Sequence, residues 1–218
     1  MKLSQFGLRI LCLAVPLMAA QLQAQTFDFK YSDFGVDPGF EVSGTINGVI
    51  PDDFNYPSGV MNFTDAPGGA VTPNFQAFCV QPHILMDYGT IATYSVAPIG
   101  GLNNSNIIAS LISAYLSSDQ DDLNAAAVQW AIWEITNEES GSYSLNSGNV
   151  LIAATDADVA ALANQYLATY GEYSPVALTY LTSATGQDIV TWQVIPEPGS
   201  VLLIGLSGMA FMARRRRA

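Results

Sequence analysis

Alternating apolar and polar residues predict that the chain turns to β-strands after its N-terminal segment. The stretch TFDFKYSDF places Phe27, Phe29 and Tyr31 between polar neighbours, which is the pattern of a strand with one buried face. The following stretch, GFEVSGTINGVI, alternates less regularly and contains Asn47-Gly48, a strong turn signal. Both stretches are therefore expected to form half-buried strands.

The next segment predicts a long loop followed by more strands. Residues 51–74 are rich in Pro, Gly, Asp and Asn, so we expect a loop that contains one short strand near 61–63. Further strands are expected over residues 75–80, 90–96, 176–182 and 189–194. These strands fall on both sides of a central segment with a different periodicity.

The central segment has apolar residues at helical spacing. Helices are predicted over residues 104–118, 123–137 and 156–170. Ser118, with Asp121 three residues later, resembles a capping box for the second helix, and Thr155 is expected to cap the third. The sequence therefore predicts an α+β fold, mainly an antiparallel β-sandwich or barrel with an inserted helical subdomain of two to three helices.

The N-terminus has the three parts of a secretory signal peptide. Lys2 and Arg9 supply positive charge, the apolar run ILCLAVPLMAA follows, and QLQA ends in a small residue. We expect residues 1–24 to be removed by cleavage after Ala24, with Ala20 as a second possible position.

The C-terminus contains a second processing signal. A Pro-Glu-Pro triplet, an apolar stretch over 201–213 and four arginines follow one another there. The residues of the triplet and of the arginine run are Pro196, Glu197, Pro198, Arg214, Arg215, Arg216 and Arg217. The apolar stretch is short against the roughly 20 residues that a permanent membrane span needs. A simple tail anchor is the alternative.

This tail, over 196–218, resembles the PEP-CTERM sorting signal of Gram-negative bacteria. The resemblance implies that an exosortase recognises the chain and removes the tail. The protein would then reach the cell surface or an extracellular, biofilm-type matrix. Contact with the membrane would be transient and confined to the transmembrane part of the tail.

Between these signals, residues 25–195 suit a single domain. Lys30 is its only lysine or arginine, so the mature chain is far more acidic than the whole sequence. Such a surface should repel nucleic acid and anionic membranes. We expect a soluble exported domain, and the acidity by itself identifies no partner.

Two residues of this domain need an explanation. Cys79 is its only cysteine, since Cys12 lies in the signal peptide, and a free thiol in an oxidising compartment is unusual. Gln129 lies on an otherwise apolar helix face beside Ile132 and Trp133, where an unpartnered amide costs about 1–3 kcal/mol. A core glutamine that bonds to loop backbone is the simpler interpretation of Gln129.

One reaction accounts for both residues. A thiolate that attacks the carboxamide carbon of a glutamine displaces ammonia and leaves an internal thioester. An amine or hydroxyl of another molecule then attacks this acyl group, forms an amide or ester crosslink and regenerates the thiol. Such a protein is a single-turnover covalent binder, not a turnover enzyme, and it needs no cofactor.

The motifs around both residues resemble the Cys–Gln thioester domain of bacterial surface adhesins. The first is FCVQP, and VQWAIWEIT follows about fifty residues later. The resemblance implies that Cys79 is the thiol and Gln129 the acyl donor, with Trp133 at the end of the glutamine motif. It also implies a covalent target, a protein or polysaccharide that carries an amine or hydroxyl.

Other uses of these residues remain open. Gln81 is close enough to Cys79 in sequence to be an alternative acyl donor, although it would need a strained ring. His83, the only histidine, could support thioester formation or, with Asp87 or Asp119, serve a Cys–His hydrolase. One cysteine and one histidine do not make a zinc site, so we expect no metal. A passive matrix protein without a thioester is the other alternative.

Overall fold

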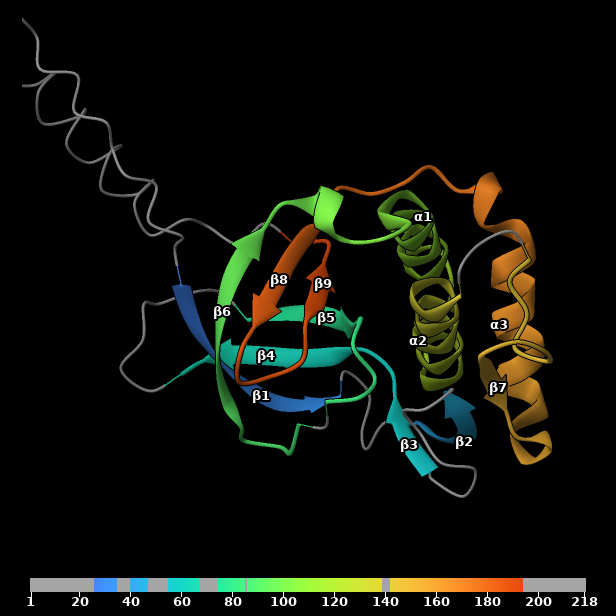
Figure 1. The fold of residues 1–218 in the computed structure, drawn as a ribbon, viewed down its shortest axis with the longest axis horizontal. Coiled ribbons are helices and arrows are strands. Elements are labelled where there is room, and N and C mark those ends of the chain that lie inside the picture. The colour runs from blue at the N-terminus through green and yellow to red at the C-terminus, as the bar shows by residue number, and fades with distance from the viewer. Residues whose placement is uncertain are drawn as a thin grey trace, which may run out of the picture.

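The chain folds as a closed antiparallel barrel beside a group of helices (Figure 1). The computed structural model describes residues 26–34, 40–46, 55–66, 74–84, 86–138 and 142–193. Within them it contains a six-stranded barrel, a small three-stranded sheet and three α-helices. The predicted α+β class is thus confirmed, with a barrel and not a sandwich as its main part.

The barrel strands follow the order β1-β4-β5-β9-β8-β6, and all their pairings are antiparallel. Their bounds are β1 Thr26–Phe34, β4 Met61–Asp65, β5 Phe75–Cys79, β9 Ile189–Thr191, β8 Thr179–Ser183 and β6 Ile91–Ala97. Closure removes free strand edges, which would otherwise pair with other chains.

The small sheet has the order β3-β2-β7 and the helices lie beside the barrel. The sheet consists of β3 Asn55–Ser58, β2 Phe40–Ile46 and β7 Val150–Ile152. The helices are α1 Ser105–Leu116, α2 Asp122–Asn137 and α3 Ala157–Thr169. Three short 3₁₀ turns occupy Ile99–Gly101, Ala154–Asp156 and Tyr170–Glu172. In Figure 1, α1 and α2 lie between the barrel and α3.

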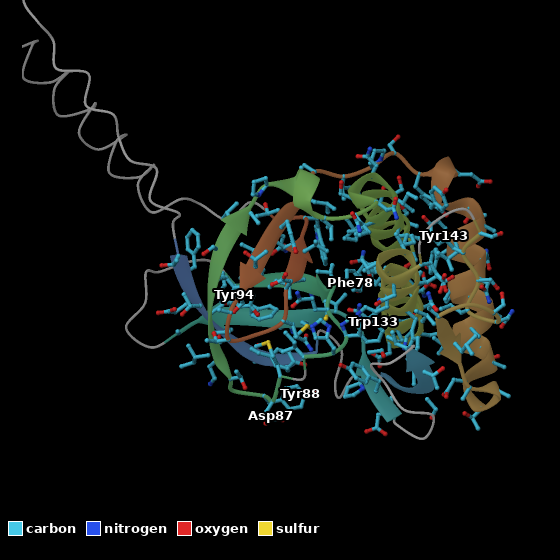
Figure 2. The ribbon with its side chains drawn as sticks, in the orientation of Figure 1. Phe78, Asp87, Tyr88, Tyr94, Trp133 and Tyr143 are labelled. Carbon is cyan, nitrogen blue, oxygen red and sulfur yellow. The ribbon has the colours of Figure 1, made fainter. Side chains whose placement is uncertain are left out.

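Aromatic side chains fill the barrel. Phe29 of β1 contacts Phe75 of β5 edge to face, with 4.7 Å between ring centres, although β4 lies between these strands. Phe63 stacks on Phe75 at 5.2 Å, and Figure 2 shows Tyr94 within the barrel. The alternation predicted for the first strand is confirmed, since its apolar side chains are the buried ones.

Helix α2 is buried on every side. All residues from 125 to 135 are buried, which is typical of a central core helix and not of an amphipathic surface helix. Phe78 of β5 packs edge to face on Tyr115 of α1 at 5.4 Å. Figure 2 shows Phe78 and Trp133 at the boundary between barrel and helices. This boundary positions the site described below.

Several local predictions were wrong. Asp121, and not Ser118, caps α2, because its side chain accepts the backbone N–H of Asn124 at 2.9 Å. Thr155 lies in a 3₁₀ turn, and α3 begins at Ala157 without a side-chain cap.

The strand predictions also missed some elements. β3 lies inside the predicted loop, and β7 has only three residues. Both strands form because their backbones pair with β2, one on each side of it. The expected strands over 176–182 and 189–194 are shorter, since they form only Thr179–Ser183 and Ile189–Thr191.

Some predictions lie outside the described residues, namely the signal peptide, the Asn47-Gly48 turn and the tail from residue 196 onwards. Among the residues that the structure does describe, no helix is long and apolar enough to cross a membrane.

Gly44 allows the small sheet to approach α2. Gly44 pairs with Ile152 of β7, and a Cβ atom there would lie 2.5 Å from the Trp130 ring and 2.4 Å from the Leu151 carbonyl oxygen. The indole N–H of Trp130 donates to Ser58 Oγ at 2.8 Å. Trp130 therefore joins α2 to the edge strand β3 and packs against the central strand β2.

We expect Gly44→Ala to lower the free energy of unfolding by about 1–3 kcal/mol, because its Cβ overpacks the Trp130 contact. Gly171→Ala is the matched control, since an added Cβ there meets no atom within 4 Å. It should change stability by less than about 0.5 kcal/mol. Urea unfolding of the two variants measures the difference, and equal stabilities would contradict the role of Gly44.

Candidate functional site

Cys79 is the last residue of β5 and lies at the boundary between the barrel and α2. It pairs with Ile189 of β9, and its side chain is 3% exposed. The sulfur accepts the backbone N–H of Gln81 at 3.3 Å. It is the free cysteine of the described residues.

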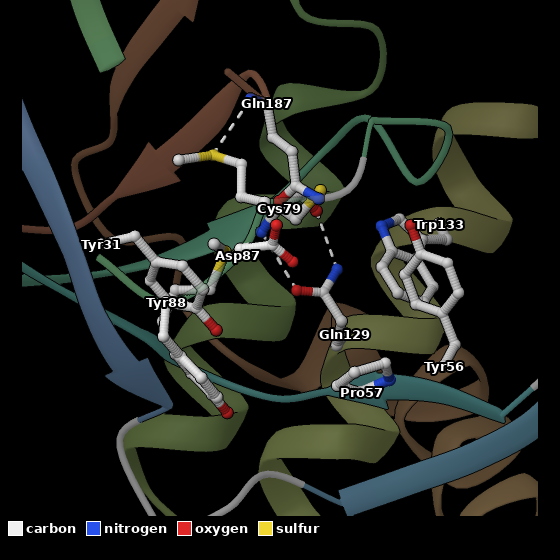
Figure 3. A pocket seen from close by; sticks show the side chains of 11 residues that line it. Tyr31, Tyr56, Pro57, Cys79, Asp87, Tyr88, Gln129, Trp133 and Gln187 are labelled. Atoms are coloured by element: carbon white, nitrogen blue, oxygen red, sulfur yellow. Dashed lines mark hydrogen bonds between the residues drawn. The ribbon is translucent and has the colours of Figure 1, made fainter. Parts of the chain in front are cut away.

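Gln129 lies in the middle of α2 and contacts Cys79 directly. Its Oε1 accepts the backbone N–H of Cys79 at 3.0 Å, and its Nε2 donates to the Cys79 carbonyl oxygen at 2.8 Å. These partners fix the orientation of the amide, because only one arrangement pairs both donors with acceptors. Figure 3 shows both bonds. Two residues fifty positions apart in sequence are thus adjacent in space.

The surroundings keep the thiol protonated. Burial raises the pKa of Cys79 to about 12, while the Gln81 N–H and the Trp133 indole lower it and Asp188 raises it further. The burial contribution dominates, so the side chain is a neutral thiol at neutral pH. Such a thiol is a poor target for external oxidants and reagents.

A cavity of about 170 Å³ opens next to both residues; we name it the Cys79 cavity. Its walls are mainly aromatic and methionine side chains, and Tyr56 contacts Trp133 edge to face at 5.0 Å. The exposed Asp87 and Tyr88 also line it. The volume suits a slender group such as an unbranched side chain and not a drug-sized ligand.

Oε1 of Gln187, a buried polar atom of this cavity, has no hydrogen-bond partner among the described residues. The indole N–H of Trp133 interacts with the Cys79 thiol, whose pKa it lowers. Gln187 is 5% exposed, and its Nε2 donates to the Ile84 carbonyl oxygen. The cavity therefore contains one unused acceptor, which is unusual for a folded interior.

The other predicted site residues lie elsewhere. His83 is exposed and does not line the Cys79 cavity, and Asp119 is an exposed residue between α1 and α2. The amide of Gln81 is bound to Asp188: its Nε2 donates to Oδ2 at 2.9 Å and its Oε1 accepts the Asp188 N–H at 3.1 Å. The described residues contain no group of three or more His, Cys, Asp or Glu that could hold a metal ion.

Sequence reasoning missed Gln187 and Tyr88, and it considered Asp87 only as a partner of His83. No motif marks Gln187, which enters the site from the turn between β8 and β9. Its position follows from barrel closure, which places β9 beside β5. A sequence pattern carries no signal of that contact.

One comparison with known proteins gives a match, at the C-terminus. Residues 194–217 match the PEP-CTERM protein-sorting motif, which confirms the tail predicted from the sequence. The motif implies an exported, cell-surface-sorted protein of Gram-negative bacteria that is processed by an exosortase. Searches of curated proteins and of solved structures found no match. The match covers only the tail.

Glu134 is a second buried polar residue on α2, next to Trp133. It is completely buried, its Oε1 accepts the Ser144 N–H at 2.6 Å, and its Oε2 has no partner among the described residues. Burial is the main reason that the pKa of Glu134 is raised to about 7. The hydrogen bond from the Ser144 N–H lowers this pKa, and the negative charge of Glu138 raises it further. The folded protein therefore holds this proton more tightly than the unfolded chain does.

We expect this pKa to make stability fall with rising pH. The contribution of Glu134 is fully present below the unfolded pKa near 4.5 and is lost as the pH rises through about 7. Glu134→Gln, which keeps the oxygen that accepts from Ser144, should remove most of this fall between about pH 5 and about pH 8. Urea unfolding at both pH values measures it. Glu172→Gln, at an exposed position, is the control; equal slopes in both variants would contradict the prediction.

Proposed function

We propose that Cys79 and Gln129 form an intramolecular thioester that attaches this protein covalently to a target molecule. The observation that supports this proposal is the pair of hydrogen bonds between the Gln129 carboxamide and the Cys79 backbone. They hold the amide of Gln129 against the backbone of the residue that carries the thiol. Proximity of this kind supplies much of the rate of an otherwise slow reaction.

The same contacts suit the formation of the bond. When Sγ of Cys79 attacks the Gln129 amide carbon, negative charge develops on Oε1. That oxygen already accepts the Cys79 N–H at 3.0 Å, which acts as a ready-made oxyanion donor. The C–S bond forms, the C–N bond breaks, and the thiol proton leaves with the amide nitrogen as ammonia. Burial of both side chains keeps water away from the product.

The second step transfers the acyl group. An amine or hydroxyl of the target attacks the carbonyl carbon of residue 129, the C–S bond breaks, and the nucleophile's proton restores the Cys79 thiol. The Gln81 N–H, 3.3 Å from the sulfur, stabilises the departing thiolate. Each protein molecule reacts once, because Gln129 is consumed.

The sorting motif suits such a role. A chain that is exported and sorted by an exosortase carries its reactive group to the cell surface, where a crosslink would fix it to another cell or to a matrix polymer. The domain holds a single lysine, Lys30, so it offers few amines of its own to the acyl group. Both features favour an adhesin or a matrix-attachment protein.

We expect the purified mature domain to weigh one ammonia molecule less than its sequence requires. Cys79→Ala and Gln129→Ala should each show the full calculated mass, because each removes one reacting group. Added methylamine should raise the wild-type mass by one methylamine and release an alkylatable thiol. Intact-mass spectrometry under denaturing conditions measures all of these species.

Two further variants test the assignment. Gln129→Glu preserves size but lacks the amide leaving group, so it should keep its full mass; Gln81→Ala should still lose ammonia, because the Gln81 amide is bound to Asp188. A full-mass wild type with a free thiol would overturn the thioester. That result would leave a passive matrix protein, or a Cys–His hydrolase that a turnover assay would detect.

A further inference from the structure

Gln187 has a feature that the proposed thioester leaves unexplained. Its side chain is buried, it lines the Cys79 cavity, and its Oε1 has no partner among the described residues. The Ile84 carbonyl oxygen accepts from Nε2, which fixes the amide orientation, because a flipped amide would bring two oxygens together. Figure 3 shows Gln187 reaching towards Cys79 from the side opposite Gln129.

A buried acceptor without a partner costs about 1–3 kcal/mol unless a bound molecule uses it. Two backbone contacts hold the residue in place: its N–H lies 3.3 Å from Met86 Sδ, and the neighbouring Asp188 carbonyl oxygen accepts the Val80 N–H at 2.9 Å. The unused oxygen is therefore held by the barrel strands beside Cys79. A donor that enters the cavity meets the side chain of Gln187.

A second acceptor becomes available when the thioester forms. Before the thioester forms, the Cys79 carbonyl oxygen accepts a hydrogen bond from Gln129 Nε2 at 2.8 Å. Loss of ammonia removes this donor. An attacking nitrogen must take the place that Nε2 left, since it becomes the new amide nitrogen. One of its N–H groups then donates to the Cys79 carbonyl oxygen.

We propose that Gln187 is an acceptor-binding residue whose Oε1 takes the second N–H of an attacking primary amine. This inference depends on the proposed thioester and adds the group that selects its reaction partner. The amine nitrogen bonds to the carbonyl carbon of residue 129 while its two hydrogens donate to Cys79 and Gln187. The C–S bond breaks, one of the two protons on the nitrogen is lost and restores the thiol, and the other stays on the new amide.

This arrangement distinguishes classes of nucleophile. A primary amine has a hydrogen for each acceptor, whereas a secondary amine or a hydroxyl has only one. An ester oxygen in the place of Nε2 would also face the Cys79 carbonyl oxygen without a hydrogen to donate. The site therefore selects primary amines on slender, unbranched stems, which the cavity of about 170 Å³ admits.

The test compares methylamine with dimethylamine on the mature domain after its loss of ammonia. In Gln187→Leu, aminolysis by methylamine should slow by about 3- to 10-fold, which is the value of one hydrogen bond. The rate with dimethylamine should change by less than about 2-fold, because that amine cannot use both acceptors. Gln165→Leu, at an exposed position on α3, is the control and should match the wild type with both amines.

Each other outcome is decisive. Gln187→Met, a second variant without the amide, should reproduce the result of Gln187→Leu. An equal slowing with both amines, or no slowing with either, overturns the role of Gln187 and leaves the thioester in place. Full mass in both Gln187 variants would mean that this residue builds the thioester and does not select its partner, which also overturns the proposal. A full-mass wild type overturns the thioester itself, and this inference with it.

Discussion

The site depends on one contact between the two halves of the molecule, the double hydrogen bond from the Gln129 carboxamide to the Cys79 backbone. A side-chain amide here imitates the pairing of a neighbouring strand at the point where β5 ends. The two bonds link the end of barrel strand β5 to helix α2. They also give the buried Gln129 amide partners for both its oxygen and its nitrogen. The same contact defines the distance and orientation at which any chemistry between the two residues would occur.

The packing of α2 makes this contact possible. A glutamine on a surface helix would exchange between rotamers, at a cost of about 1.5–2 kcal/mol to hold one of them. In this protein α2 is buried from 125 to 135, and Trp130 is held by Ser58 and by the space that Gly44 leaves. This packing positions Gln129, and its two hydrogen bonds to the Cys79 backbone hold the amide in one orientation.

Burial also sets the chemical character of the site. It raises the pKa of the Cys79 thiol to about 12, so the thiol is neutral at neutral pH. In the Cys79 cavity, burial also leaves Oε1 of Gln187 without a partner among the described residues. At the C-terminus, the sorting motif implies export and processing by an exosortase.

The sequence by itself determined the parts of the protein whose signals are local. Residue alternation, helical periodicity and the linear order of the tail predicted the barrel strands, α1 to α3 and the sorting motif, because each depends on neighbours in the chain. Shorter elements such as β3 and β7 were missed because they depend on pairing with β2. Two helix caps were misplaced, since Asp121 caps α2 and Thr155 lies in a 3₁₀ turn. Only the tertiary structure decided that Gln129 contacts the Cys79 backbone, that Gln81 is held by Asp188, and that Gln187 enters the cavity. These contacts arise when barrel closure brings β9 beside β5 and when α2 packs across the end of β5. The motifs suggested that Cys79 and Gln129 act together, but the backbone hydrogen bonds between them and the position of Gln187 depend on this packing.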